Sequence, residues 1–159
     1  MAATSSVDLD TDPRAIIATR ELDAPRALVF EVWTDPKHLS QWWGPDGFSV
    51  TSQSFDMRPG GTWRFVMHGP DGTDYDNLVT FEIVEKPARL VYRHGDASEP
   101  EQFRTTVTFE ALDARRTRVT LHAVFPSAAA RDRVVREFGA AKGAEQTLAR
   151  MDAYVASRR

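Results

Sequence analysis

Tyr92 and His94 each carry a polar group and lie on the predicted apolar face of one short strand. Tyr92 and His94 alternate with other residues of the segment 89–94, on the same face as Leu90. Because alternate residues of a strand point to one side of a sheet, both side chains are expected to face inward near a strand end. An imidazole in that position can hydrogen-bond a ligand carbonyl or act as a general base. The alternative is that His94 is an exposed histidine at the end of its strand.

The other titratable residues show no pattern typical of a reaction centre. His38, His68 and His122 fall on separate predicted elements, and no two histidines lie four residues apart, so no metal site is expected. Asp74 and Asp76 share a face beside a Gly-Pro-Asp-Gly turn, which favours solvated carboxylates over an acid–base pair. The chain has no cysteine and no nucleophile or phosphate-binding motif. The sequence therefore predicts no catalytic residue, no metal and no cofactor.

Large apolar side chains recur on the inward face of several predicted strands. They oppose a predicted helix that carries small residues at Ala140, Ala141, Gly143 and Ala144. Bulky residues that face small ones can leave room for a ligand, and they can equally interdigitate to full packing density. The candidate ligand-binding residues are Trp42, Trp43, Trp63, Phe65, Met67, Tyr75, Phe81, Tyr92, His94, Phe103 and Phe138.

Composition and charge limit the class of partner. The chain has 159 residues and a formal net charge of −3, with a sequence pI of about 5.8. Phosphate binding needs a clustered basic face, so nucleic acid is not expected as a partner. No run of 18 apolar residues is present, which predicts no membrane span, and residues 1–12 lack the features of a secretion signal. A cytoplasmic location is therefore expected.

The hydrophobic periodicity predicts one domain over residues 13–157, preceded by a disordered lead-in over residues 1–12. Two short helices follow the first strand, and one long helix over 128–156 ends the chain, with Ser127 as its N-cap and Gly139 inside it. The strands are expected at 14–22, 48–56, 62–68, 75–84, 89–94, 102–112 and 117–125. Hairpin-length connections make this an α+β fold, in which an antiparallel sheet of about six to seven strands curves around the C-terminal helix.

A series of short segments carries a resemblance over roughly residues 14–156. These segments are DAP (23–25), VF (29–30), WTDP (33–36), WWGP (42–45), DMRPGGTW (56–63), MHGPDG (67–72), EIVEKPARLVY (82–92), TTVTFE (105–110) and TRVTL (117–121). In this order and spacing they resemble the SRPBCC (START/Bet v 1-like) superfamily. Within it, the chain is similar to the family named after the activator of the heat-shock-90 chaperone ATPase.

The resemblance implies a helix-grip fold with a cavity between the sheet and the C-terminal helix. Superfamily members bind lipids, polyketides, hormones or other hydrophobic molecules, and some catalyse cyclisation or hydrolysis. Members of the family often carry a tryptophan where this chain has Ala144, which implies a larger pocket at that end. We therefore expect the protein to bind a small hydrophobic or aromatic ligand.

Two alternatives remain open at this point. One is an enzyme, a cyclase or hydrolase, that uses His94 or a tyrosine in the same cavity. The other is an interaction protein that modulates a chaperone ATPase, as the family name suggests. A homodimer is expected only because two-fold dimers are common among small proteins.

Overall fold

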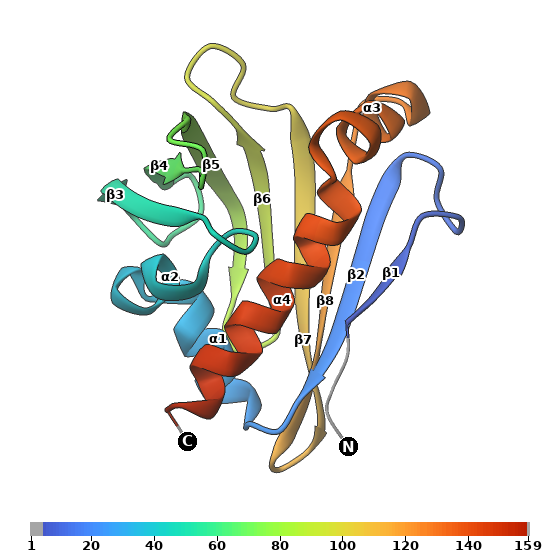
Figure 1. Cartoon of the computed structure of the whole chain (residues 1–159). Helices are drawn as coiled ribbons and strands as arrows, with labels where there is room; N and C mark the ends of the chain where they lie inside the picture. Colours follow the sequence, from blue (N-terminus) through green and yellow to red (C-terminus); the bar gives the residue numbers. More distant parts are fainter. Residues whose placement is uncertain (1–4, 159) are drawn as a thin grey trace.

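The computed structural model describes residues 5–158, and its framework is one antiparallel sheet in the order β1-β2-β8-β7-β6-β5-β4-β3 (Figure 1). The strands are β1 (Ser6–Asp8), β2 (Ala15–Leu22), β3 (Ser49–Phe55), β4 (Thr62–His68), β5 (Asp74–Glu85), β6 (Arg89–Gly95), β7 (Phe103–Asp113) and β8 (Arg116–Val124). Register shifts in the pairs β3–β4, β5–β6 and β7–β8 mark bulges. Bulges of this kind bend a sheet and increase its twist.

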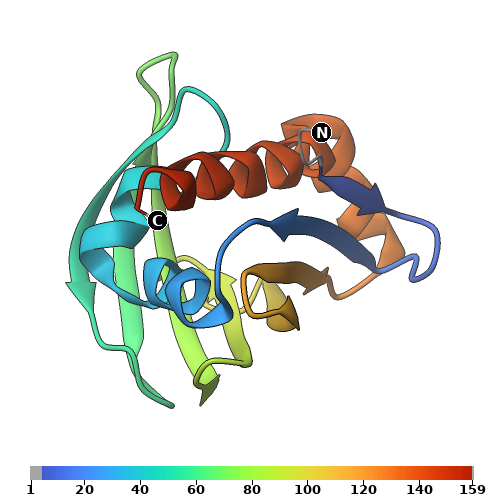
Figure 2. The same cartoon turned by 90° about the horizontal axis from the view of Figure 1, so that it is seen from below.

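The curved sheet encloses the C-terminal helix. The helices are α1 (Arg26–Thr34), α2 (Pro36–Trp42), α3 (Ala128–Phe138) and α4 (Ala140–Ala156). Figure 2 shows α4 crossing the concave side of the sheet, with α1 and α2 beside it. This arrangement confirms the expected helix-grip fold. Among the described helices, none is long and apolar enough to cross a membrane.

The alternation of β7 shows why the sheet has one buried face. Thr105, Val107 and Phe109 are buried, whereas Thr106 and Thr108 between them are half-buried and the flanking Arg104 and Glu110 are exposed. A period of two places one set of side chains against α4 and the other in solvent. On the outer side, Arg104 pairs with Glu82, and Arg118 of β8 pairs with Glu110.

The first core cluster forms where α1 and α2 meet the sheet. The indole of Trp33 packs edge-on against Trp42, with ring centroids 4.9 Å apart, and against Phe109 at 5.9 Å. Nε1 of Trp42 donates to the carbonyl oxygen of Val32 at 3.0 Å, so this buried polar group is satisfied. Trp42 is therefore part of the core.

The predicted single C-terminal helix is wrong, because the chain breaks at Gly139. Ser127 caps α3 as predicted, accepting from the backbone N–H of Ala130 at 3.0 Å. Gly139 then adopts a left-handed conformation, with φ 60° and ψ 37°, and its N–H bonds the carbonyl of Val134. Glycine enters this region without the steric cost that other residues meet, so it ends α3 and begins α4.

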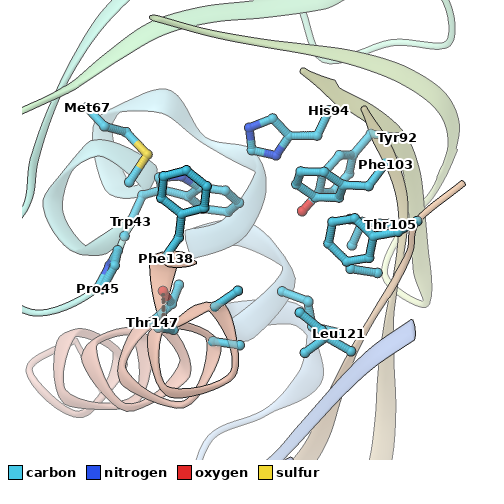
Figure 3. A pocket seen from close by; sticks show the side chains of 17 residues that line it. Trp43, Pro45, Met67, Tyr92, His94, Phe103, Thr105, Leu121, Phe138 and Thr147 are labelled. Carbon is cyan, nitrogen blue, oxygen red and sulfur yellow. Dashed lines mark hydrogen bonds between the residues drawn. The ribbon is translucent and has the colours of Figure 1, made fainter. Parts of the chain in front are cut away.

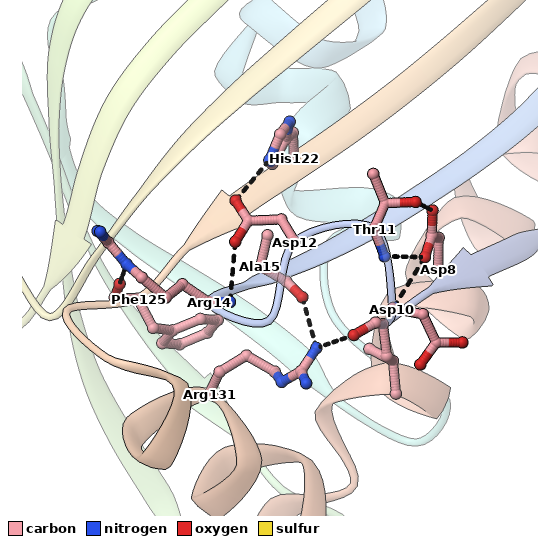
Figure 4. A network of polar contacts seen from close by, with 10 residues as sticks. Asp8, Asp10, Thr11, Asp12, Arg14, Ala15, His122, Phe125 and Arg131 are labelled. Atoms are coloured by element: carbon pink, nitrogen blue, oxygen red, sulfur yellow. Dashed lines mark hydrogen bonds and ion pairs between the residues drawn. The ribbon is translucent and has the colours of Figure 1, made fainter.

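The predicted disorder of residues 1–12 is also wrong for the residues that the structure describes. Ser6 pairs with Thr19 in β1–β2, which adds a strand beyond the six or seven expected. Nη1 of Arg131 donates to the carbonyl oxygens of Leu9 at 2.7 Å and Ala15 at 2.8 Å (Figure 4). The buried guanidinium thus fastens the segment after β1 to the start of β2 and to α3. Residues 1–4 lie outside the described part of the chain.

Candidate ligand-binding cavity

A cavity of about 290 Å³ lies between α4 and the inner face of β6, β7 and β8. Figure 3 shows aromatic side chains on one side of it and the helix on the other. The residues that line it are Ile16, Trp43, Gly44, Pro45, Met67, Tyr92, His94, Phe103, Thr105, Leu121, Ala123, Phe125, Phe138, Ala140, Gly143, Ala144 and Thr147. All of these described lining residues are uncharged if His94 is neutral. The cavity is therefore apolar with a few polar groups, as in most small-molecule sites.

Short side chains on α4 leave the space open on the helical side. Ala140, Gly143 and Ala144 face the cavity from successive turns. A Cβ placed on Gly143 would meet only the ring of Pro45, at 3.6 Å, which is ordinary contact. The cavity exists because small helix residues oppose the strands instead of interdigitating with them, as the sequence suggested for Ala144.

The loop after α2 forms one wall and is held by α4. Nη1 of Arg150 donates to the carbonyl oxygens of Gly44 and Pro45, each at 2.8 Å, and of Trp43 at 3.3 Å. Hydrogen bonds from a charged donor are stronger than neutral ones. Arg150 therefore positions Trp43 and Pro45 against the cavity.

His94 lies inside the cavity wall, and the exposed alternative is wrong. The residue is 9% exposed, and its ring centroid lies 4.8 Å from that of Phe103 and 6.4 Å from that of Trp43. Its Nε2 lies 2.8 Å from Oδ1 of Asn77 on the neighbouring strand β5. Burial lowers the pKa of His94 to about 4, because the apolar surroundings disfavour the charged imidazolium.

Tyr92 and Thr105 place two hydroxyl groups on the same wall. The two residues are direct partners in the β6–β7 register. Burial raises the pKa of the Tyr92 phenol well above its usual value, and a hydrogen bond with Thr105 opposes this shift. The phenol is therefore neutral at physiological pH and available for hydrogen bonding.

The structure divides the candidate residues of the sequence into two groups. Those that line the cavity are Trp43, Met67, Tyr92, His94, Phe103 and Phe138. Those that lie elsewhere are Trp42, Trp63, Phe65, Phe81 and Tyr75. All of the second group are core residues except Tyr75, which is 42% exposed on β5.

The indole of Trp43 explains why part of the inward face is core. It covers Trp63 at a centroid distance of 5.3 Å and Phe65 at 6.2 Å. It thereby separates these two rings from the cavity. Phe138 lines the cavity from a position that is 67% exposed, so the cavity reaches solvent beside it.

Several lining residues were not among the sequence candidates. Thr105 and Leu121 lie on the predicted inward faces of β7 and β8, so their parity was a usable signal. Thr147 lies one turn beyond Gly143 on α4 and donates to its carbonyl at 2.8 Å. No sequence pattern marked Asn77, which lies behind the lining residues on β5 and contacts His94 on the adjacent strand β6.

A cluster of three hydrogen-bonded side chains, centred on His68, lies on the outer side of the sheet. Nε2 of His68 lies 2.8 Å from Oγ1 of Thr51, and its Nδ1 lies 2.7 Å from Oδ1 of Asp74. The order hydroxyl, imidazole and carboxylate is that of a hydrolase triad. All three side chains are at least partly exposed on an open sheet surface, so we assign them to cross-strand stabilisation.

Solved structures from several bacteria share this fold. A solution structure from Arthrobacter aurescens is 29% identical, with a TM-score of 0.85 over 96% of this chain and 91% of that one. A crystal structure from Mycobacterium smegmatis is 28% identical, with a TM-score of 0.86 over 97% and 98%. An AHSA1 protein from Silicibacter pomeroyi is 20% identical, with a TM-score of 0.74 over 91% and 99%.

The family comparison agrees with the fold and with the sequence segments described above. No match was found among curated proteins. Residues 23–156 match the family described as activator of Hsp90 ATPase homolog 1-like protein. The matched region runs from α1 through α4. Because this match covers most of the chain, the protein belongs to the family of activator of Hsp90 ATPase homolog 1-like proteins.

Proposed function

We propose that the protein binds a small, neutral and mostly apolar molecule in the cavity between α4 and the sheet. The observation that carries this proposal is a 290 Å³ space with uncharged lining residues and a few polar groups on one wall. A cavity of about 150 Å³ is enough for benzene. The space in this protein accommodates a compound of one or two rings.

Burial of apolar surface supplies the driving force in this proposal. A ligand the size of one aromatic side chain buries roughly 200 Å², worth about 5 kcal/mol before the cost of association. That cost is itself at least about 4 kcal/mol. A single ring therefore binds weakly, and a two-ring compound that fills the cavity binds more tightly.

The chemistry of His94 favours binding over proton transfer. A general base works best when its pKa lies near the working pH, whereas burial lowers the pKa of this imidazole to about 4. The ring is a weak base that remains available as a hydrogen-bonding group. Turnover of a bound compound that is lost in His94→Ala while binding survives would instead support an enzyme.

The exposed apolar residues do not favour a protein-interaction surface. Within the described chain, the large hydrophobic residues that are exposed are Tyr75 on β5 and Phe138 on α3. A contiguous exposed apolar patch would favour a docking surface, and these two residues lie on separate elements. A cytoplasmic location and a homodimer stay predictions of the sequence.

Native mass spectrometry of the purified protein, followed by extraction and identification of any bound molecule, is the direct test. Calorimetric titration with naphthalene then compares the wild type with two variants on α4. Ala144→Trp fills the cavity and is expected to abolish binding, whereas Ala153→Trp adds the same side chain at an exposed position. Equal binding by a folded Ala144→Trp variant would contradict the proposal, as would failure of the wild type to bind any apolar probe.

A further inference from the structure

The amide of Asn77 has an orientation fixed by two neighbours. Its Nδ2 donates to the carbonyl oxygen of Tyr75 at 3.0 Å. A carbonyl can only accept, so the nitrogen of the amide must face Tyr75. The amide oxygen Oδ1 therefore faces Nε2 of His94, at 2.8 Å.

This arrangement determines which imidazole nitrogen carries the proton. Because Oδ1 of Asn77 can only accept, Nε2 of His94 must be the N–H donor. Burial among aromatic rings keeps the imidazole neutral at pH 7. A neutral imidazole has one N–H group, so Nδ1 holds a lone pair and can only accept.

Nδ1 of His94 is a polar atom on the cavity wall that the described part of the protein leaves without a partner. No described residue forms a hydrogen bond with this nitrogen. Within the described chain, the buried side-chain atoms that lack both a hydrogen-bond partner and contact with solvent are Nε of Arg93 and Nε2 of His122, so Nδ1 of His94 is accessible from the cavity. Figure 3 shows the imidazole at the cavity, beside Tyr92 and Phe103. An acceptor is thus presented within an apolar wall, where an unmade hydrogen bond is costly.

The neighbouring hydroxyl pair complements this acceptor. Tyr92 and Thr105 are cross-strand partners, and their two hydroxyl groups carry two protons, of which a bond between them would use only one. The other proton remains available to a ligand oxygen. A ligand hydroxyl, which both donates and accepts, matches this wall better than a carbonyl or an ether.

The same lining disfavours anionic ligands. None of the described residues that line the cavity is a lysine or arginine, and the nearby Nη1 of Arg150 is bonded to the carbonyls of the wall. A carboxylate buried there would lose its hydration, would find no cation, and would face the lone pair of Nδ1. The carbonyl partner suggested for His94 by its position in the sequence is excluded as well, since Asn77 already occupies the N–H group.

We infer that the ligand is a neutral, mostly apolar ring compound carrying an O–H or N–H group that donates to Nδ1 of His94. This inference rests on the proposed binding function and adds the chemical class of the ligand. Asn77 is a positioning residue in this scheme, because it acts by holding the imidazole in one tautomer.

Three two-ring probes separate the possibilities by calorimetric titration at pH 7.5. These are 2-naphthol, its methyl ether 2-methoxynaphthalene, and 2-naphthoate. We expect 2-naphthol to bind about tenfold more tightly than the methyl ether, which cannot donate. The naphthoate, being charged, is expected to bind most weakly.

Matched histidine variants then locate the effect. His94→Phe keeps an aromatic ring but removes the acceptor, so the preference for the naphthol over its ether should fall to about one. His68→Phe makes the same change on the outer face and should keep the preference. Asn77→Leu is a second variant, which should reduce the preference by releasing the tautomer.

The outcomes separate a wrong donor group from a wrong binding function. If the naphthol and the ether bind equally well to the wild type, the inferred donor is wrong and the binding function stands. If none of the three probes binds, the proposed function fails and the inference fails with it. A nitrogen NMR spectrum that shows His94 protonated at Nδ1 in the free protein would overturn the inference without any ligand.

Discussion

The imidazole of His94 and the phenyl ring of Phe103 lie with their centroids 4.8 Å apart, at an angle of 35°. The two residues are cross-strand partners of β6 and β7. Because the ring of His94 is packed against aromatic carbon, protonation would place a charge in a site that cannot solvate it.

The stability of the protein should therefore fall below pH 6.5. His94 titrates near its usual pKa of 6.5 when unfolded and at about 4 when folded, so the unfolded state binds more protons between these values. Stability is fully present above pH 6.5 and decreases by about 3 kcal/mol as the pH falls to 4. Urea unfolding across this range measures the slope, and His94→Phe should lack it. An identical slope in the variant would assign the dependence to other groups.

Two glycines of the C-terminal region should respond oppositely to alanine. Gly139→Ala meets no atom within 4 Å but requires φ +60°, so it should destabilise the protein by about 1 kcal/mol. Gly143→Ala lies within α4 and makes only ordinary contact with Pro45, so it should stabilise by roughly 0.5–1 kcal/mol. Denaturant midpoints compare them directly. Stabilisation by Gly139→Ala would mean that the chain forms one continuous helix.

Arg150 should couple the fold to ligand binding. Arg150→Met keeps an apolar stem but removes the donor to Gly44 and Pro45, and should cost about 2 kcal/mol. The affinity for 2-naphthol should also fall, because Pro45 lines the cavity. Arg136→Met, at an exposed position on α3, is the control and should change stability by less than about 0.5 kcal/mol. Unchanged binding in a folded Arg150→Met variant would contradict this role.

Arg131 should determine whether the N-terminal strand stays on the sheet. Arg131→Met removes the bonds to the carbonyls of Leu9 and Ala15. Amide protons of β1 should then exchange with solvent faster, while those of β7 should not change. Arg133→Met provides the comparison, because the guanidinium of Arg133 pairs with Glu137 on the surface. If β1 exchanges equally in both variants, its attachment depends on strand pairing alone.

The sheet was predictable because its signal is local. The alternation of Thr105, Val107 and Phe109 is enough to assign one face of β7 to the interior. The same parity placed His94 inside, where the structure has it. Local periodicity also located α1, α2 and the N-cap at Ser127.

Long-range contacts explain what the sequence did not reveal. The segment around β1 is ordered by Arg131, which lies 122 residues after Leu9. The break at Gly139 interrupts a stripe of apolar residues that continues through it, so periodicity alone predicted one helix. Parity showed which side chains of β4 face inward, but not that Trp43 covers Trp63 and separates it from the cavity.

The break at Gly139 also divides the C-terminal region into parts of unequal stability. In α3 the fully buried residue is Arg131 and the apolar Ala130, Val134 and Val135 are only partly buried, whereas α4 buries Thr147, Leu148, Met151 and Val155. A segment with little buried apolar surface opens at a lower free energy than the core around it. Since Phe138 ends α3 at the side where the cavity reaches solvent, that side can open while α4 keeps its grip on the sheet. Under the proposed binding function, the rate of ligand entry and the global stability of the domain can then vary independently, each through substitutions on a different side of Gly139.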